Sequence, residues 1–175
     1  MIKAENQPPV NFTYFKANYL DASAAVKLVI TERGSDHLHA YFANRSGFFI
    51  TSLCLFEALN VLKRKMHKRE ISRKQYFDGC WLLLTYLRTK RIRIDEPEIS
   101  SLEIFERAEK LANLHRIDLS DALQLVGLKH GRFCKLDKES KSLLITADQP
   151  LAKAAKTEGL RVWNCEEEPW RENSA

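Results

Sequence analysis

The sequence predicts an α/β fold of three layers, in which a central, mostly parallel sheet lies between two layers of helices. Two observations predict this class. Short apolar segments alternate along the chain with longer segments that have helical periodicity. No repeat, long linker or low-complexity stretch divides the 175 residues, a length that suits one domain with one sizeable core. Such alternation favours parallel strands, because a chain returning to start the next parallel strand usually does so through a helix.

Strands are expected at short segments that are mostly apolar. These segments are 17–20, 48–50, 92–94, 143–146 and 160–163. The polar segment 1–16, with its Pro8-Pro9 pair, is expected to form a flexible N-terminal arm. The residues from 164 onward, acidic and then polar, are expected to form a C-terminal tail over 164–175, which leaves a domain spanning 17–163.

Helices are expected between these strands, and local signals place several of their ends. Asn44–Gly47 is a turn before the second strand, Thr51 or Ser52 can cap the long helix that follows it, and Pro97 marks a turn after the third strand. The helix over 72–89 has apolar positions at Phe77, Trp81, Leu84 and Leu87. The expected helices are 23–30, 35–43, 51–66, 72–89, 99–114, 119–129 and 148–157.

Composition excludes several classes of protein. With 45% hydrophobic and 29% charged residues the chain is globular, and no apolar run approaches the roughly 20 residues of a membrane span. The N-terminus lacks the apolar core of a signal peptide, and the four cysteines form no C-x-x-C pair. Free thiols in a reducing cytoplasm are therefore expected. The net charge of +5 permits a polyanionic partner without demanding one.

Four acids are placed where a strand ends or near the start of a helix: Asp21, Glu57, Asp121 and Asp148. Asp21 and Asp148 follow predicted strands, and ligands of open α/β sheets bind at the carboxyl ends of the strands. Glu57 and Asp121 lie on helix faces that are otherwise apolar. We therefore expect all four to converge on one site.

Converging carboxylates need a cation, because like charges raise each other's pKa. Oxygen ligands without Cys or His favour Mg²⁺ or Mn²⁺ over zinc, and such a cation can polarise a phosphoryl oxygen and activate water. Hydrolysis of a phosphodiester is the reaction that this chemistry suits.

Each acid also has a purely structural interpretation. Asp21 and Asp148 can be helix caps or turn residues, Asp121 can complement a helix dipole, and Glu57 can be a solvated acid. Asp118 precedes Asp121 by three residues, which favours N-capping, with an accessory metal role as the alternative.

Two hydroxyl groups are candidates to support the acids. Ser23 and Thr146 can hydrogen-bond the carboxylates or a metal-bound water, although either can instead satisfy only local backbone groups.

Four sequence segments together resemble the motifs of PIN-domain nucleases. They are Tyr19-Leu20-Asp21-Ala22-Ser23, Leu53-Cys54-Leu55-Phe56-Glu57, Leu119-Ser120-Asp121-Ala122 and Ile145-Thr146-Ala147-Asp148. Their order and spacing fit the family over residues 17–163, and the length is most similar to that of VapC-type toxins of toxin–antitoxin pairs.

The resemblance implies a PIN-like fold and a metal-dependent endoribonuclease. Asp21, Glu57, Asp121 and Asp148 would hold Mg²⁺ or Mn²⁺ and position the attacking water, with Ser23 and Thr146 in support. It also implies a homodimer, a cognate antitoxin protein as inhibitor, and tRNA or rRNA as substrate.

Two basic segments could bind RNA phosphates. Lys63, Arg64 and Lys65 belong to the densest run, and a second group is formed by Arg88, Lys90, Arg91 and Arg93. Either can equally be a solvated face.

Two other functions compete with the nuclease. One is an inactive PIN-like module that binds RNA or protein, although none of the four acids is missing. The other is a haloacid-dehalogenase-like phosphatase, which needs a second Asp two residues after Asp21, where this chain has Ser23.

Overall fold

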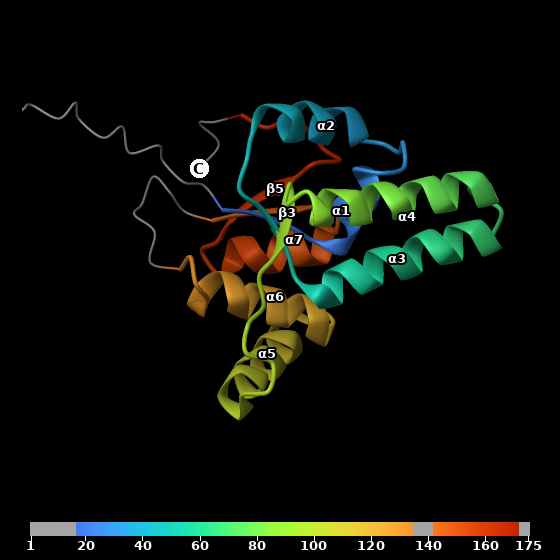
Figure 1. The fold of residues 1–175 in the computed structure, drawn as a ribbon. Coiled ribbons are helices and arrows are strands. Elements are labelled where there is room, and N and C mark those ends of the chain that lie inside the picture. The colour runs from blue at the N-terminus through green and yellow to red at the C-terminus, as the bar shows by residue number, and fades with distance from the viewer. Residues whose placement is uncertain (1–16, 135–141, 172–175) are drawn as a thin grey trace, which may run out of the picture.

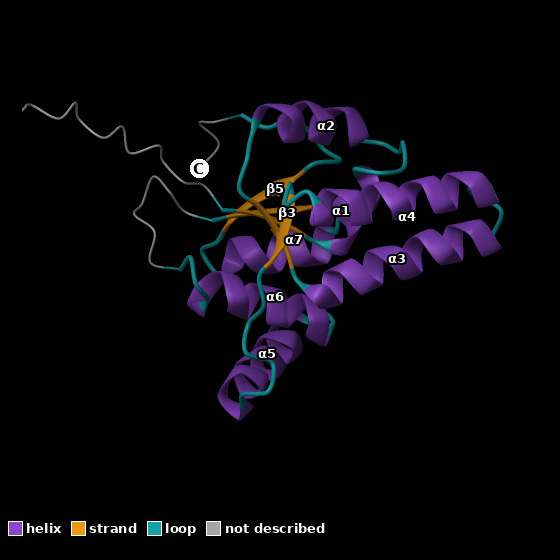
Figure 2. Ribbon diagram, in the orientation of Figure 1, coloured by secondary structure: helices purple, strands orange, loops and turns teal. Residues whose placement is uncertain are grey.

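The computed structural model describes residues 17–134 and 142–171. Its centre is a sheet of five strands, all parallel, in the order β3-β2-β1-β4-β5. Helices cover both faces of this sheet (Figures 1 and 2), so the predicted three-layer α/β/α class is confirmed. The strands are β1 (Asn18–Leu20), β2 (Phe48–Ile50), β3 (Ile92–Ile94), β4 (Leu143–Thr146) and β5 (Arg161–Asn164).

Seven helices connect or follow these strands within the described residues. They are α1 (Ala22–Lys27), α2 (Ser35–Asn44), α3 (Ser52–His67), α4 (Arg73–Arg88), α5 (Leu102–His115), α6 (Leu119–His130) and α7 (Gln149–Thr157). Side-chain caps define several of their starts. The Thr51 hydroxyl accepts from Cys54 N at the start of α3, and Ser72 forms a capping box with Gln75 at the start of α4.

Each face of the sheet has its own hydrophobic core. On one face α1, α2, α3 and α4 pack against alternate strand residues, such as Phe48, Ile50 and Ile145. On the other face α6 and α7 pack against the residues that point the opposite way, such as Phe49 and Leu144. The helix α5 packs mainly on α6. A parallel sheet buried on both faces explains why its strands read as continuous apolar segments.

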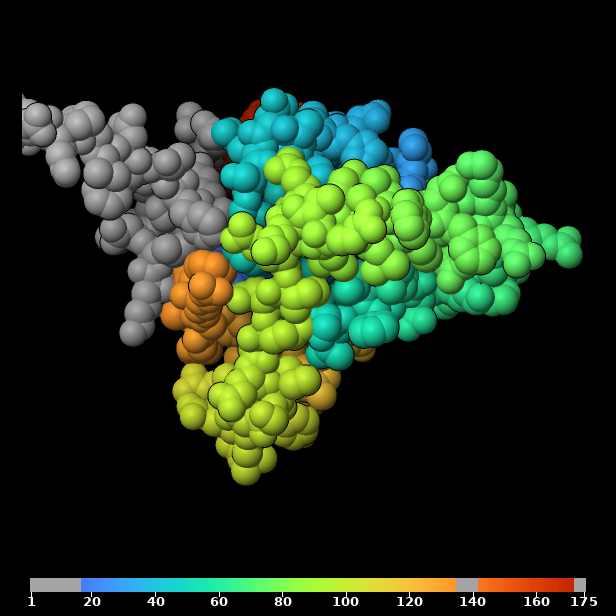
Figure 3. Space-filling view, in the orientation of Figure 1, coloured from blue at the N-terminus to red at the C-terminus, as the bar shows by residue number. Residues whose placement is uncertain are grey.

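The helix α4 is positioned differently from what its apolar pattern predicts. Phe77 and Trp81 are 54% and 68% exposed, and Leu84 is also exposed, whereas Gly79 and Leu83 are buried. The pair α3 and α4 projects from the body of the domain, so only one face of α4 meets the core (Figures 1 and 3).

The C-terminal segment packs against the domain beyond residue 163. β5 includes Asn164, Cys165 is fully buried, and the Trp170 ring lies 5.9 Å from that of Trp163. The predicted boundary at 163 therefore lies inside the packed domain, which continues at least to Trp170. The predicted N-terminal arm, 1–16, lies outside the described residues.

None of the four cysteines forms a disulfide: Cys54 and Cys165 are buried, Cys80 is half-buried and Cys134 is exposed. Among the described residues, none of the helices has the length and apolar character needed to cross a membrane.

Candidate functional site

Two of the four acids follow neighbouring strands directly at the same edge of the sheet. Asp21 comes after β1 and Asp148 comes two residues after Thr146 of β4, while Leu20 pairs with Ile145 across the two strands. Because every strand is parallel, these ends share the carboxyl edge of the sheet. The other two acids lie on helices, Glu57 in α3 and Asp121 in the first turn of α6.

Asp21 is a buried carboxylate held by three hydrogen-bond donors. It is only 4% exposed. Its Oδ1 accepts from the Ser23 hydroxyl at 2.7 Å and from Ala24 N at 2.8 Å, and its Oδ2 accepts from the Thr146 hydroxyl at 2.5 Å. The bond from Ala24 N makes Asp21 the N-cap of α1, so the structural role considered from sequence is real. A carboxylate offers about four acceptor positions, and an acceptor position on Oδ2 remains for a further partner.

The two supporting hydroxyls are oriented by backbone groups of the β4–α7 connection. Ser23 Oγ accepts from Ala147 N at 2.7 Å, and Thr146 Oγ1 accepts from Asp148 N at 2.8 Å. Because each oxygen already accepts a backbone proton, its own proton is directed to Asp21. Ser23 and Thr146 therefore both donate to the Asp21 carboxylate, which favours its ionised form, and their supporting role in a metal site stays a prediction.

Burial and the negative charges of neighbouring acids nevertheless raise the pKa values of Asp21 and Asp121. The pKa of Asp21 is raised to about 6, chiefly by burial and in addition by the charge of Asp148, although three hydrogen bonds oppose the increase. The pKa of Asp121 is raised to about 7 by burial together with the negative charges of Asp21, Asp148, Glu57 and Asp118. No basic side chain is among the main influences on either acid. The four acids are therefore near enough for Asp21, Asp148 and Glu57 to influence the pKa of Asp121, and their convergence on one site stays a prediction.

Asp148 also caps a helix. Its Oδ1 accepts from Leu151 N at 2.8 Å at the start of α7, where Pro150 occupies the first turn. As with Asp21, the capping bond fixes the side chain without using all of its acceptor positions.

Asp118 corrects one prediction from the sequence. It occupies the N-cap position of α6, but its side chain makes no capping hydrogen bond and is exposed. Its charge instead raises the pKa of Asp121 one turn away. The spacing identified the right position, and the reciprocal partner that a capping box needs is absent because Asp121 belongs to the acidic group.

Carboxylate oxygens suit a hard divalent cation, but the side chains of these acids do not form a closed coordination shell. Within residues 17–134 and 142–171, no three His, Cys, Asp or Glu side chains lie close enough together to hold one metal ion. Coordination by several of these acids would require their side chains to turn toward each other on an otherwise fixed backbone. The raised pKa of Asp121 is the effect that a cation bound among them would reverse.

Gln124 is a site residue that the sequence analysis did not single out. It lies one turn after Asp121 on α6, is 1% exposed, and donates from Nε2 to Leu20 O at 3.2 Å. Its Oε1 is buried without a hydrogen-bond partner. The bond fixes α6 against the residue that precedes Asp21. A polar residue inside the apolar segment Leu123–Val126 was the available signal.

The predicted basic run on α3 does not form a uniform cationic face. Lys65 is paired with Glu32 at 2.6 Å and with Glu70 at 3.2 Å, so its charge is neutralised locally. Lys63 lies over the Tyr76 ring at 5.2 Å. Arg64 is exposed. Phosphate binding by Lys63 and Arg64 stays a prediction, whereas Lys65 is already engaged.

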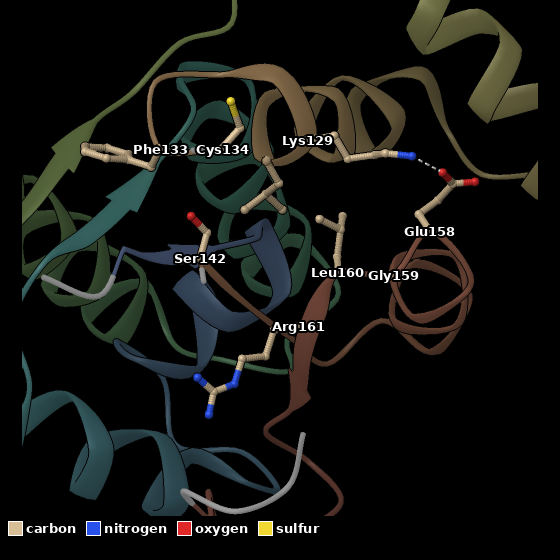
Figure 4. Close-up of a pocket in the computed structure, with 9 residues that line it drawn as sticks. Lys129, Phe133, Cys134, Ser142, Glu158, Gly159, Leu160 and Arg161 are labelled. Atoms are coloured by element: carbon tan, nitrogen blue, oxygen red, sulfur yellow. Dashed lines mark hydrogen bonds and ion pairs between the residues drawn. The ribbon is translucent and has the colours of Figure 1, made fainter. Parts of the chain in front are cut away.

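Several cavities lined by described residues lie away from the four acids. One of about 230 Å³ opens at the amino ends of β4 and β5, where Ser142 and Arg161 face it and Lys129 pairs with Glu158 (Figure 4). Two others measure about 560 and 420 Å³. None of these three is lined by Asp21, Glu57, Asp121 or Asp148. The candidate site is therefore identified by the position and charge of its residues.

Comparison with known proteins supports the fold. No family model matches the chain, and no curated protein matches it. Among solved structures, the chain is similar to that described as PAE2754 from Pyrobaculum aerophilum, with a TM-score of 0.54 and 19% sequence identity. The match covers 84% of this chain and 89% of that one. At this identity the similarity establishes a shared architecture.

Proposed function

We propose that this protein is a Mg²⁺- or Mn²⁺-dependent endoribonuclease of the PIN-domain type. The observation that carries the proposal is the group of carboxylates at the carboxyl edge of the sheet, in which burial and mutual repulsion raise the pKa of Asp121 to about 7. Asp21 in the same group has hydrogen-bond donors suited to the ionised form. A buried group of like charges costs free energy unless a positive charge joins it.

Asp21, Glu57, Asp121 and Asp148 are the residues that would hold the cation. A bound divalent ion would supply charge stabilisation at a phosphoryl oxygen and lower the pKa of a coordinated water. The protein's own contribution is to fix Asp21 through Ser23 and Thr146, which limits the freedom of one ligand before any ion arrives.

Asp121 has a second possible role within the same site. Because its pKa is raised to about 7, it can hold or release a proton near neutral pH. An ion would shift Asp121 to its ionised form, so metal binding at neutral pH should release a proton from the protein.

RNA is proposed as the substrate because of the four motifs described above, and the net charge of +5 permits a polyanionic partner. By the same resemblance we propose tRNA or rRNA as the target, a toxin role in the cytoplasm, inhibition by a cognate antitoxin, and a homodimer. The exposed apolar residues of α4, Phe77, Trp81 and Leu84, are a surface that a protein partner could cover.

The proposal is tested by incubating purified protein with total bacterial RNA in Mn²⁺, in Mg²⁺ and in EDTA. We expect discrete cuts that need the metal and are lost in Asp21→Asn. The matched control is Asp36→Asn, which removes an exposed acid in the first turn of α2 and should cut normally. Cutting that survives in EDTA, or in Asp21→Asn, would reject the assignment. A folded protein that binds RNA but neither cuts it nor binds Mn²⁺ would indicate the inactive binding module instead.

A further inference from the structure

A cationic cavity lies at the opposite end of the sheet from the acids. It has a volume of about 420 Å³ and is lined by Ser46, Gly47, Phe48, Thr89, Lys90, Arg91 and Arg93. Phe48 pairs with Ile92, so the cavity lies where the α2–β2 and α4–β3 connections meet, at the amino ends of β2 and β3. In Figure 1 the chain passes from α4 into β3 at this place. Its volume is within the roughly 300–1,000 Å³ typical of ligand pockets.

The charge of this cavity is uncompensated. Three basic residues line it, and no acidic residue does. Lys90 and Arg93 are exposed, and among the described residues neither has an ion-pair partner. By contrast, Lys27, Lys65 and Lys129 are each paired with glutamates. Cations left without acidic partners around a concave surface create a positive potential that concentrates anions there.

Arg91 gives the cavity a rigid wall. Its guanidinium donates to Phe42 O and lies 4.4 Å from the ring centroid of Phe42 and 5.4 Å from that of Phe48. These contacts hold the planar group in place while leaving other N–H groups available. A fixed guanidinium is well suited to bind phosphate oxygens, because little side-chain freedom is lost on binding.

β3 presents a second cation to solvent. Ile92 is buried, whereas Arg93 and Ile94 are exposed. β3 is an edge strand, and among the described residues no further strand covers this side of the sheet. Lys90, Arg91 and Arg93 thus supply three cations along the edge.

We propose that Lys90, Arg91 and Arg93 form a phosphate-binding site that holds the backbone of an RNA strand away from the acidic site. The proposal rests on the proposed function, because an RNA substrate supplies the phosphates. The acids lie around the end of β1, two strands away, and β3 is three residues long. With about 4.8 Å between strands and about 3.3 Å per residue, the two sites are separated by roughly 14 Å. An RNA strand of several nucleotides can span that distance.

The test is fluorescence anisotropy of a labelled 12-nucleotide single-stranded RNA with the full chain in EDTA, at several salt concentrations. The variant Lys90→Ala/Arg93→Ala removes two unpaired cations and leaves Arg91, which contributes to packing. The control Lys153→Ala/Lys156→Ala removes the same charge from exposed positions on α7. Thermal melting of both variants checks that the fold is kept.

Loss of two phosphate contacts should make the negative slope of log K against log salt shallower by about 1.4, because each contact with a single strand contributes ~0.7. With equal affinities of the variant and the wild type at 1 M salt, this difference in slope makes the affinity of the variant about 25-fold weaker at 0.1 M salt. The control should show a much smaller change. Equal affinities and slopes in the two variants would overturn the proposal.

Titration with inorganic phosphate distinguishes the source of the phosphate. If Lys90→Ala/Arg93→Ala loses phosphate binding but keeps its affinity for RNA, the site takes a small phosphorylated compound and the RNA assignment is overturned. Because the anisotropy is measured in EDTA, it does not depend on cleavage. If Lys90→Ala/Arg93→Ala binds RNA more weakly but the wild-type protein never cuts RNA, this site is retained and the proposed activity is rejected. If the wild type cuts RNA but the double variant binds it with unchanged affinity, the activity is retained and this site is rejected.

Discussion

The Thr146 hydroxyl donates a hydrogen bond of 2.5 Å to Asp21 Oδ2, joining residues 125 positions apart in the chain. The same hydroxyl oxygen accepts from Asp148 N at 2.8 Å. One side chain at the end of β4 therefore connects the acid after β1 to the backbone of the acid that starts α7. The carboxyl ends of two neighbouring strands are held together by this contact.

Thr146→Val tests that connection. Valine keeps the shape of threonine but can neither donate to Asp21 nor accept from Asp148 N, and Thr146 is fully buried. We expect the free energy of unfolding to fall by about 1–3 kcal/mol, because buried polar groups lose their partners. Equilibrium unfolding in urea measures the change. Thr146→Ser keeps the hydroxyl and should cost less; equal losses in the two variants would mean that the methyl group, not the hydrogen bond, is what matters.

Asp121→Asn should reveal, as a pH-dependent stability, the cost of ionising Asp121 in a partly buried position among other acids. The folded pKa of Asp121 is raised to about 7 from its ordinary value of 3.8. The folded protein therefore binds the proton more tightly than the unfolded chain, and wild-type stability falls as pH rises from about 4 to 7. The asparagine variant lacks this loss of stability. Without metal, its free energy of unfolding should exceed that of the wild type by about 1–2 kcal/mol at pH 8 and should equal it below pH 4.

The measurement is urea unfolding of both proteins in EDTA across that pH range. Partial exposure of Asp121 reduces the gain below the full shift in pKa. A stability difference that is the same at pH 4 and pH 8 would show that neither burial nor the neighbouring acids raise the pKa of Asp121.

Asp118→Ala should hardly affect stability. Although Asp118 occupies the N-cap position of α6, its side chain makes no capping bond, so we expect a change within about 0.5 kcal/mol. Ser72→Ala is the matched comparison, because Ser72 forms a complete capping box at the start of α4 and should cost about 0.5–2 kcal/mol. Thermal melting of both variants decides the matter; a loss in Asp118→Ala as large as in Ser72→Ala would restore the capping role.

The sequence predicts the fold well where local chemistry decides it. Strand segments such as Leu143–Thr146 are apolar throughout because both faces of the sheet are covered, and that pattern is readable without a structure. Asp21 and Asp148 could be assigned to the same edge because parallel strands end together. Both acids are helix caps, so the structural interpretation is correct for each, and capping does not prevent them from belonging to the proposed site.

Other features depend on tertiary contacts that periodicity does not record. The apolar positions Phe77, Trp81 and Leu84 of α4 gave no sign that the helix projects from the body and turns them to the surface. Lys65 belonged to a basic run in sequence, but the fold brings Glu32 from a distant loop to within 2.6 Å of it. In the sequence, Trp170 lies in a segment that is otherwise polar, and only the fold shows that it packs on Trp163 and Tyr41.

The most direct test of the central claim is calorimetric titration of the protein with Mn²⁺ near pH 7. If the four acids form one cation site, Asp21→Asn, Glu57→Gln, Asp121→Asn and Asp148→Asn should each weaken binding by at least about tenfold, while Asp36→Asn binds as wild type does. Binding should also release a proton, seen as a heat that depends on the buffer, because the ion lowers the raised pKa of Asp121. Absence of Mn²⁺ binding by the folded wild-type protein, or binding that survives in all four variants, would contradict the account.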